Sequence, residues 1–162
     1  MFGSAMPSPV PPIDGRQSPG ARAIARGTTR LLAAMDFAVV PELPLPSGRR
    51  ADLTALSRKG ALWIVEIKSS VQDFRTDAKW GDYRAHADRV LFAVAPDFPV
   101  GLLPESAGLI LADAHGADLV REGQSAALPA PTRKVMMLRF ARAAAGRMTL
   151  LCDPQARGQS DL

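Results

Sequence analysis

The fold of this chain is decided by two stretches, Arg49-Arg50-Ala51-Asp52 and Leu62-Trp63-Ile64-Val65-Glu66-Ile67-Lys68. The second stretch is mostly apolar, which predicts a β-strand over residues 61–69. Successive side chains of a strand point to opposite faces, so Glu66 and Lys68 share one face. A charge within an apolar strand is costly unless it is paired or bound to a metal. These two residues are therefore candidates for a functional site.

Asp52 is a second carboxylate in an apolar setting, on a strand predicted over residues 49–56. If the two strands pair as a hairpin, Asp52 lies beside Glu66, and the two carboxylates repel each other. A divalent cation that prefers oxygen ligands, Mg²⁺ or Mn²⁺, relieves this repulsion. Such a metal polarises a phosphate, and Lys68 beside it stabilises the developing charge. The pattern therefore suits metal-assisted phosphodiester hydrolysis, with metal ligands Asp52 and Glu66 and catalytic residues Asp52, Glu66 and Lys68.

A simpler interpretation of the same residues is a structural ion pair between Glu66 and Lys68 on a half-exposed strand. Short motifs often arise by chance, and the spacing alone favours this ion pair. The choice between the two interpretations therefore depends on the surrounding elements.

The predicted elements describe an α/β fold. Apolar periodicity predicts helices over residues 21–35, 71–87 (interrupted near Gly81) and 132–150, and strands over 39–45, 49–56, 61–69, 89–95, 108–112 and 117–121. Short turns join the first three strands, which indicates an antiparallel meander. Gly27, in the middle of the first helix, costs helix stability and indicates a close approach of this helix to the sheet. The expected architecture is a mixed central sheet flanked by helices.

Composition sets the broad class of the protein. The chain has 162 residues, enough for one domain, and its 20 basic against 16 acidic residues weakly favour an anionic partner such as nucleic acid. A single cysteine excludes an intrachain disulfide and a cysteine-based zinc site. The sequence shows no secretory signal and no membrane-spanning run, so we expect a cytoplasmic protein without membrane contact. We expect a disordered Pro-rich leader (1–20), a folded domain (21–151) and a flexible tail (152–162).

The motif and its surroundings resemble a known superfamily. Arg49-Arg50-Ala51-Asp52 followed by Trp63-Ile64-Val65-Glu66-Ile67-Lys68-Ser69-Ser70 is similar to the PD-(D/E)XK nucleases, whose core is helix, three strands, helix, strand. The runs Asp73-Phe74-Arg75, Lys79-Trp80, Tyr83, Phe92-Ala93-Val94 and Leu103-Pro104 more closely resemble the MmcB family of bacterial DNA repair proteins. The resemblance covers nearly all of residues 21–150. It implies a restriction-endonuclease-like core, Mg²⁺ or Mn²⁺ held by Asp52 and Glu66, and a catalytic Lys68.

The chain also departs from the superfamily pattern. Many members carry a glutamate on the first helix, which has no acid here, and Glu42 on the first strand is either its substitute or a surface acid. Some members carry Gln-x-x-x-Tyr after the Glu-x-Lys strand, and the equivalent here begins at Lys79 and ends at Tyr83. Asp73 is a further supporting candidate, although a solvated helix face explains it more simply.

The resemblance implies a role in DNA damage repair, with DNA as partner and with repair-pathway proteins as further candidate partners. Arg22, Arg26 and Arg30, spaced four apart, form a helical stripe that either tracks a phosphate backbone or is a solvated face, and Arg50 lies beside Asp52. The first hypothesis is a metal-dependent DNA nuclease. The alternatives are a catalytically weak or inactive DNA-binding or scaffolding module, and an interaction protein with only an ion pair. The sequence leaves the oligomeric state open.

Overall fold

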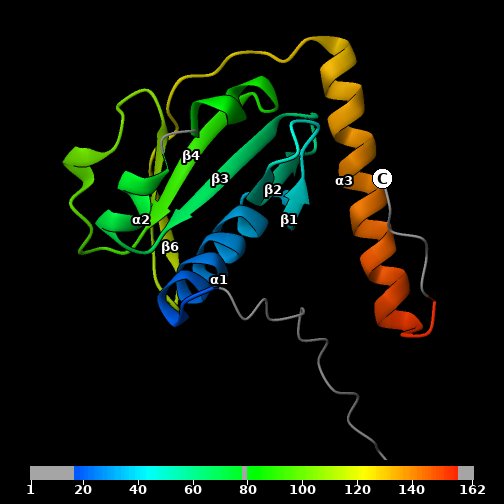
Figure 1. Ribbon diagram of the computed structural model, residues 1–162, viewed down its shortest axis with the longest axis horizontal. Coiled ribbons are helices and arrows are strands. Elements are labelled where there is room, and N and C mark those ends of the chain that lie inside the picture. Colours follow the sequence, from blue (N-terminus) through cyan, green and yellow to red (C-terminus); the bar gives the residue numbers. More distant parts are fainter. Residues whose placement is uncertain (1–16, 78–79, 157–162) are drawn as a thin grey trace, which may run out of the picture.

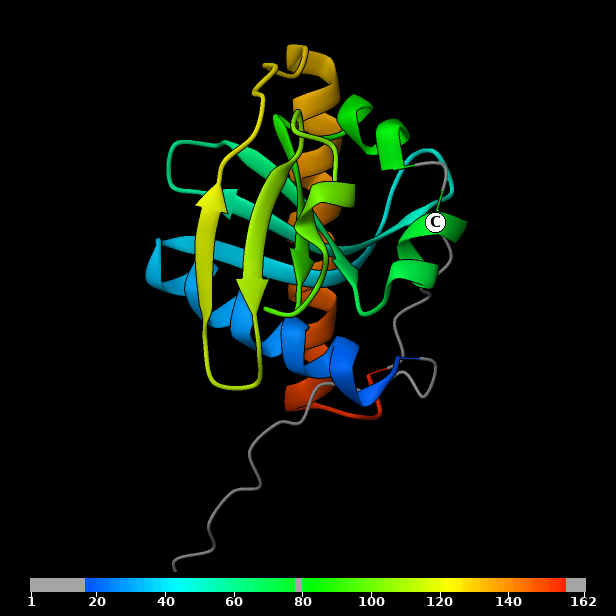
Figure 2. The ribbon, with the colours of Figure 1, turned by 90° about the vertical axis from the view of Figure 1, so that its left-hand side faces the viewer.

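A six-stranded sheet with helices on both faces forms the protein (Figures 1 and 2). The computed structural model describes residues 17–77 and 80–156. The elements are α1 (Pro19–Ala34), β1 (Phe37–Pro44), β2 (Arg50–Ser57), β3 (Leu62–Lys68), α2 (Val71–Thr76), the 3-10 helix η1 (Trp80–Ala85), β4 (Arg89–Val94), η2 (Val100–Leu102), β5 (Gly108–Ala112), β6 (Ala117–Arg121) and α3 (Ala130–Cys152). In this part of the chain, no helix has the length and apolar character needed to cross a membrane.

The strands lie in the sheet in the order in which they occur in the sequence. β1, β2 and β3 pair antiparallel, which confirms the predicted meander. β4 pairs parallel to β3 and β5 pairs parallel to β4, while β6 returns antiparallel to β5. This mixed sheet, entered from α1 and crossed by α2 and η1 between β3 and β4, is a restriction-endonuclease-like arrangement, as predicted.

The alternation along β3 divides the core between the two faces of the sheet. Trp63 and Val65 pack with Ile24 and Leu32 of α1 on one face. Ile64 belongs to the opposite face, where Tyr83 of η1 and Met136 and Phe140 of α3 cover it. Because Glu66 and Lys68 follow Ile64 in the same alternation, they lie on the face away from α1.

Helix α3 is held at its beginning by a buried polar group that connects three distant segments. Asp88 accepts hydrogen bonds from the amides of Leu62 and Leu128, at 2.8 and 2.9 Å. Its two carboxylate oxygens also accept hydrogen bonds from the two terminal nitrogens of Arg133, at 2.8 and 2.6 Å. Paired in this way, a buried carboxylate is satisfied and fixes the angle at which α3 leaves the sheet.

The helical segment predicted over residues 71–87, with an interruption near Gly81, is observed as two separate helices. α2 ends at Thr76 with Asp77 as its C-cap, and the segment resumes at Trp80 as a 3-10 helix that runs through Gly81. The first helix begins earlier than predicted, because Ser18 caps it and Pro19 occupies its first turn. The two predicted strands at 108–112 and 117–121 are confirmed.

Gly27 allows a close contact, as predicted, but with a turn at the edge of the sheet. A Cβ atom added at Gly27 would lie 2.3 Å from the carbonyl oxygen of Asp113 and 2.4 Å from that of Gly116. Both atoms belong to the backbone of the turn between β5 and β6, which cannot move away as a flexible side chain would. The helix therefore requires glycine here despite its poor helix propensity.

We expect Gly27→Ala to destabilise the protein by about 1–3 kcal/mol, because the cost of overpacking exceeds the gain in helix propensity. Gly146→Ala is the matched control, since Gly146 lies in α3 and an added Cβ meets no atom within 4 Å. This control should be neutral or more stable by up to about 1 kcal/mol. Chemical denaturation of both variants measures the difference. Equal effects of the two substitutions would contradict the close contact.

Candidate active site

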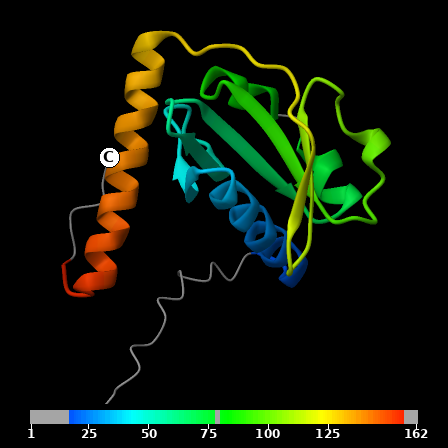
Figure 3. The same cartoon turned by 180° about the vertical axis from the view of Figure 1, so that it is seen from behind.

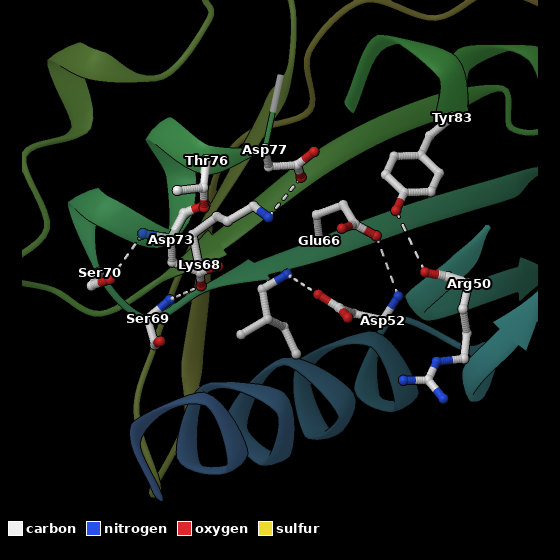
Figure 4. A network of polar contacts seen from close by, with 11 residues as sticks. Arg50, Asp52, Glu66, Lys68, Ser69, Ser70, Asp73, Thr76, Asp77 and Tyr83 are labelled. Carbon is white, nitrogen blue, oxygen red and sulfur yellow. Dashed lines mark hydrogen bonds and ion pairs between the residues drawn. The ribbon is translucent and has the colours of Figure 1, made fainter. Parts of the chain in front are cut away.

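The site lies in a fork where β2 and β3 separate. Cross-strand pairing runs from Leu56 opposite Leu62 to Leu53 opposite Val65 and ends there. Beyond this point β2 stays paired with β1, and β3 stays paired with β4. The next residues in register are Asp52 and Glu66, whose side chains therefore point into the same opening (Figure 4).

The two carboxylates take over the hydrogen bonds that the diverging strands lose. The backbone amide of Asp52 donates to Oε1 of Glu66 at 3.3 Å, and the amide of Ile67 donates to Oδ2 of Asp52 at 2.8 Å (Figure 4). An unpaired buried amide is costly, so these contacts stabilise the fork. They also fix both carboxylates side by side.

Burial raises the pKa of both carboxyl groups, that of Glu66 above neutral pH. Burial raises the pKa of Glu66 to about 8, and the charge of Asp52 adds to the effect. Burial also raises the pKa of Asp52 to about 6, against the hydrogen bond from Ile67 and with the help of Glu42. Perturbed carboxylates of this kind gather at functional sites, because ordinary structural acids are exposed or paired with a cation.

Lys68 is paired with an acid other than Glu66. Its Nζ lies 2.7 Å from Oδ2 of Asp77, and only 5% of Lys68 is exposed. Burial acts to lower the pKa of Lys68, but the hydrogen bond and charge of Asp77, followed by the charge of Glu66, outweigh it and raise the pKa. Lys68 is therefore a charged ammonium directed into the site, and the expected alternative of a simple Glu66–Lys68 ion pair is not the arrangement observed.

Two supporting candidates are structural neighbours of the site. Ser70 caps the start of α2, since its Oγ accepts a hydrogen bond from the amide of Asp73 at 3.1 Å, and the carboxylate of Asp73 accepts one from the amide of Ser69 at 3.2 Å. Tyr83 is buried and donates from its hydroxyl to the carbonyl oxygen of Arg50 at 3.4 Å. Burial and then the charges of Glu66, Asp77 and Asp52 raise the pKa of Tyr83 above its usual range, so it is a neutral hydroxyl beside the carboxylates.

Glu42 lies opposite Asp52 in the register of β1 and β2, in a left-handed conformation with φ of 51°. Its carboxylate forms an ion pair with Arg50 and accepts a hydrogen bond from Nε2 of Gln17 at 2.9 Å. Arg147 of α3 donates to the carbonyl oxygens of Pro41 and of Glu42, the latter at 3.0 Å. Left-handed backbone costs a residue with a side chain about 1–2 kcal/mol, so these contacts offset a local strain at the edge of the site.

The donor set fits a hard divalent cation with few protein ligands. Among residues 17–77 and 80–156, no group of three or more His, Cys, Asp or Glu side chains is arranged to hold a metal. Mg²⁺ is commonly bound by one or two carboxylates, water and substrate phosphate, and Asp52 with Glu66 offers such a pair. A bound cation would neutralise the charge of the two carboxylates and so remove the repulsion that destabilises them.

The predicted DNA-binding arginines are not all near the carboxylates. Arg22, Arg26 and Arg30 belong to α1, which covers the opposite face of the sheet. Arg22 donates to the carbonyl oxygen of Gln17, and Arg30 donates to those in the β5–β6 turn. Arg50, by contrast, lies at the rim of the site, paired with Glu42.

Two contacts at the site were not expected from the sequence, and one predicted site residue is not described by the structure. Lys79, predicted as a supporting residue, falls outside the described residues. Asp77 is the C-cap of α2 and forms an ion pair with Lys68, a contact that the sequence did not predict. The contact of Arg147 with β1 joins residues more than a hundred positions apart, and no local pattern signals it.

We expect metal-free Glu66→Gln to be more stable than the wild type at alkaline pH. The folded pKa of about 8 lies above the reference value of 4.5, so the native state binds the extra proton, and stability falls as pH rises between these values. Glutamine keeps an oxygen for the amide of Asp52 and removes the charge. The gain should be on the order of 1–3 kcal/mol, since one pKa unit is worth about 1.4 kcal/mol.

Thermal denaturation in the presence of a chelator, at pH values on either side of 8, measures this gain. Glu105→Gln, a substitution of an exposed acid, is the control and should leave the pH profile unchanged. A wild type whose stability rises with pH across this range would contradict the buried, protonated state of Glu66.

Comparison with known proteins identifies the family of this chain. The family model described as DNA repair protein MmcB-like matches residues 8–155. The solved structure of the SPO1766 protein of unknown function from Silicibacter pomeroyi is similar, with a TM-score of 0.83 and 41% identity over 90% of this chain and 99% of that chain. No curated protein matches the sequence. With nearly the whole chain matched, this protein belongs to the MmcB-like family of DNA repair proteins.

Proposed function

We propose that the protein is a metal-dependent deoxyribonuclease that acts in DNA repair. The observation that carries the proposal is the buried pair of repelling carboxylates, Asp52 and Glu66, beside the charged ammonium of Lys68. A fold alone would not justify an activity, because related folds carry many functions. Here the residues in the fork match the chemistry of phosphodiester hydrolysis, and the family supplies DNA repair as the setting.

Each residue of the site has a distinct role in this proposal. Asp52 and Glu66 would hold Mg²⁺ or Mn²⁺, which would supply Lewis-acid polarisation of a phosphate and activation of the attacking water. Lys68 stabilises negative charge that builds up on the phosphate. Asp77 keeps Lys68 charged and fixes its position, and Arg50 at the rim provides a cation for the DNA backbone.

A second candidate function is a DNA-binding or scaffolding module without cleavage activity. The observation that favours it is the small donor set, with two carboxylates and no third acid grouped with them in the described residues. Such a module retains the fork as a structural device, because the carboxylates satisfy two backbone amides without any metal. The two functions differ in whether a metal binds at Glu66 and whether DNA is cut.

We expect Mn²⁺ binding to strengthen as pH rises, because the metal displaces protons from Glu66, of pKa about 8, and from Asp52, of pKa about 6. Below these values the affinity should gain about tenfold per pH unit for each displaced proton. Calorimetric titration in buffers of different ionisation enthalpy counts the protons released. Glu66→Gln should weaken binding and release one proton fewer. Binding that is equally strong in this variant would contradict the metal site and favour the second candidate.

We expect Asp52→Ala combined with Glu66→Ala to abolish cleavage of labelled single-stranded, duplex and branched DNA in the presence of Mn²⁺. Lys68→Met should lower the rate by about a hundredfold or more while metal binding persists, because the ammonium acts on the phosphate. Circular dichroism establishes that each variant is folded, and Glu105→Gln serves as an active control. Wild-type rates in the double variant would exclude these residues as the nuclease site.

A further inference from the structure

Helix α3 carries most of the exposed apolar side chains in the described part of the chain. The described residues include nine exposed large hydrophobic side chains. Six of these nine lie on α3: Val135, Met137, Leu138, Met148, Leu150 and Leu151. Only Met136 and Phe140 of this long helix are buried. Figure 3 shows α3 along one side of the sheet, with its outer side turned away from the rest of the fold. The six exposed residues lie on several sides of the helix, and two of them, Leu138 and Met148, fall on one exposed stripe together with small side chains. An exposed apolar stripe of this kind marks an interaction surface.

The exposed side of α3 has the spacing of a helix–helix contact. Six exposed residues follow one another at alternating intervals of four and three positions, and we call them the outer seam: Lys134, Leu138, Ala141, Ala145, Met148 and Cys152. On a helix this spacing forms one stripe, and here the stripe lies opposite the buried Met136 and Phe140. The outer seam is thus a coiled-coil-like surface that the fold itself does not cover.

The four central side chains of the outer seam have the same order of sizes in both directions. Its four central members are large, small, small and large: Leu138, Ala141, Ala145 and Met148. An antiparallel second helix of the same sequence places alanine against alanine in the middle and Leu138 against Met148 at both ends. Crossing helices are closest at the middle and diverge outward, so small central and large outer side chains fit them. A twofold interface requires this kind of self-complementarity.

Charge also favours the antiparallel orientation. α3 contains five basic residues and no acid, so a parallel pair would align like charges along its whole length. Three of the five are bonded to the body of the protein, through Asp88, Pro44 and Glu42. In the antiparallel pair, Lys134 of one copy meets the C-terminal end of the other helix. That end carries the negative pole of the helix dipole and its C-cap, Asp153.

We propose that the outer seam of α3 is the interface of a homodimer, in which a second copy of this chain docks antiparallel about a twofold axis at the level of Ala143. An open groove of about 530 Å³, lined by residues such as Leu56, Met137 and Leu138, borders the first half of the seam. It lies beside the position at which the second copy presents Met148 and its C-terminal turn. The active-site fork is on β2 and β3, so both copies keep their sites outside the seam.

The first test measures the mass of the full-length protein by light scattering and sedimentation over micromolar to millimolar concentrations. We expect the wild type to have the mass of a dimer. Ala145→Arg should halve this mass, because a long cation then occupies the closest point of the two helices. Ala144→Arg is the matched control, since Ala144 is the exposed neighbour off the seam and should leave the dimer intact. Thermal denaturation of both variants verifies that α3 remains folded.

The second test reads the orientation by disulfide trapping. In the antiparallel pair the two Cys152 side chains lie about 27 Å apart, the rise of the intervening helix, so the wild type should not cross-link on oxidation. Lys134→Cys places a thiol opposite Cys152 of the second copy and should yield a covalent dimer, whereas Lys134→Ser should not. Efficient Cys152–Cys152 cross-linking of the wild type would overturn the antiparallel arrangement. A wild type that stays monomeric at every concentration, or binds only acidic peptides or anionic vesicles through α3, would overturn the homodimer.

Discussion

The separation of β2 from β3 is the constraint on which the rest of the structure depends. Where two paired strands part inside a core, their amides lose their partners and become costly. Here the side chains of Asp52 and Glu66 supply the missing acceptors. The solution stabilises the backbone but brings two acids together out of water, where both ionised forms are disfavoured. The fork therefore satisfies two backbone amides but destabilises the ionised forms of the two carboxylates. A bound cation would stabilise these ionised forms.

The elements around the fork are arranged to support this unfavourable pair. β4 keeps β3 in place along its whole length, so the fork opens on one side only. The break between α2 and η1 places Asp77 at the ammonium of Lys68 and Tyr83 above the carboxylates. Asp77, the C-cap of α2, is therefore part of the site. Functional sites commonly break local rules in this way.

The sequence predicted those features that depend on local periodicity. Alternation in the Glu66 strand placed two charges on one face, and short turns around it predicted the meander that sets Asp52 opposite Glu66. The interruption of the segment after β3 was predicted near Gly81, but the end of α2 at Thr76 lies earlier, because helix spacing continues through Asp77 while the cap ends the helix. The partners of Asp88 and Arg147 were also beyond reach, since a hydrogen bond between distant segments has no signature in either segment alone.

Helix α3 shows how one element can serve two purposes through its two faces. Its inner face buries Met136 and Phe140, and its Arg147 contacts the backbone of the left-handed Glu42, which lies opposite Asp52 in the register of β1 and β2. Part of the energy that fixes this strained residue comes from a helix that otherwise contributes few buried side chains, and Arg50 and Gln17 supply the rest. A helix so sparsely buried is poorly anchored by the core alone, because tertiary packing supplies most helical stability. Packing of a second copy on its outer face would therefore rigidify α3. Because Arg147 of the same helix contacts the edge of the active site, assembly would also make the geometry of the site more rigid.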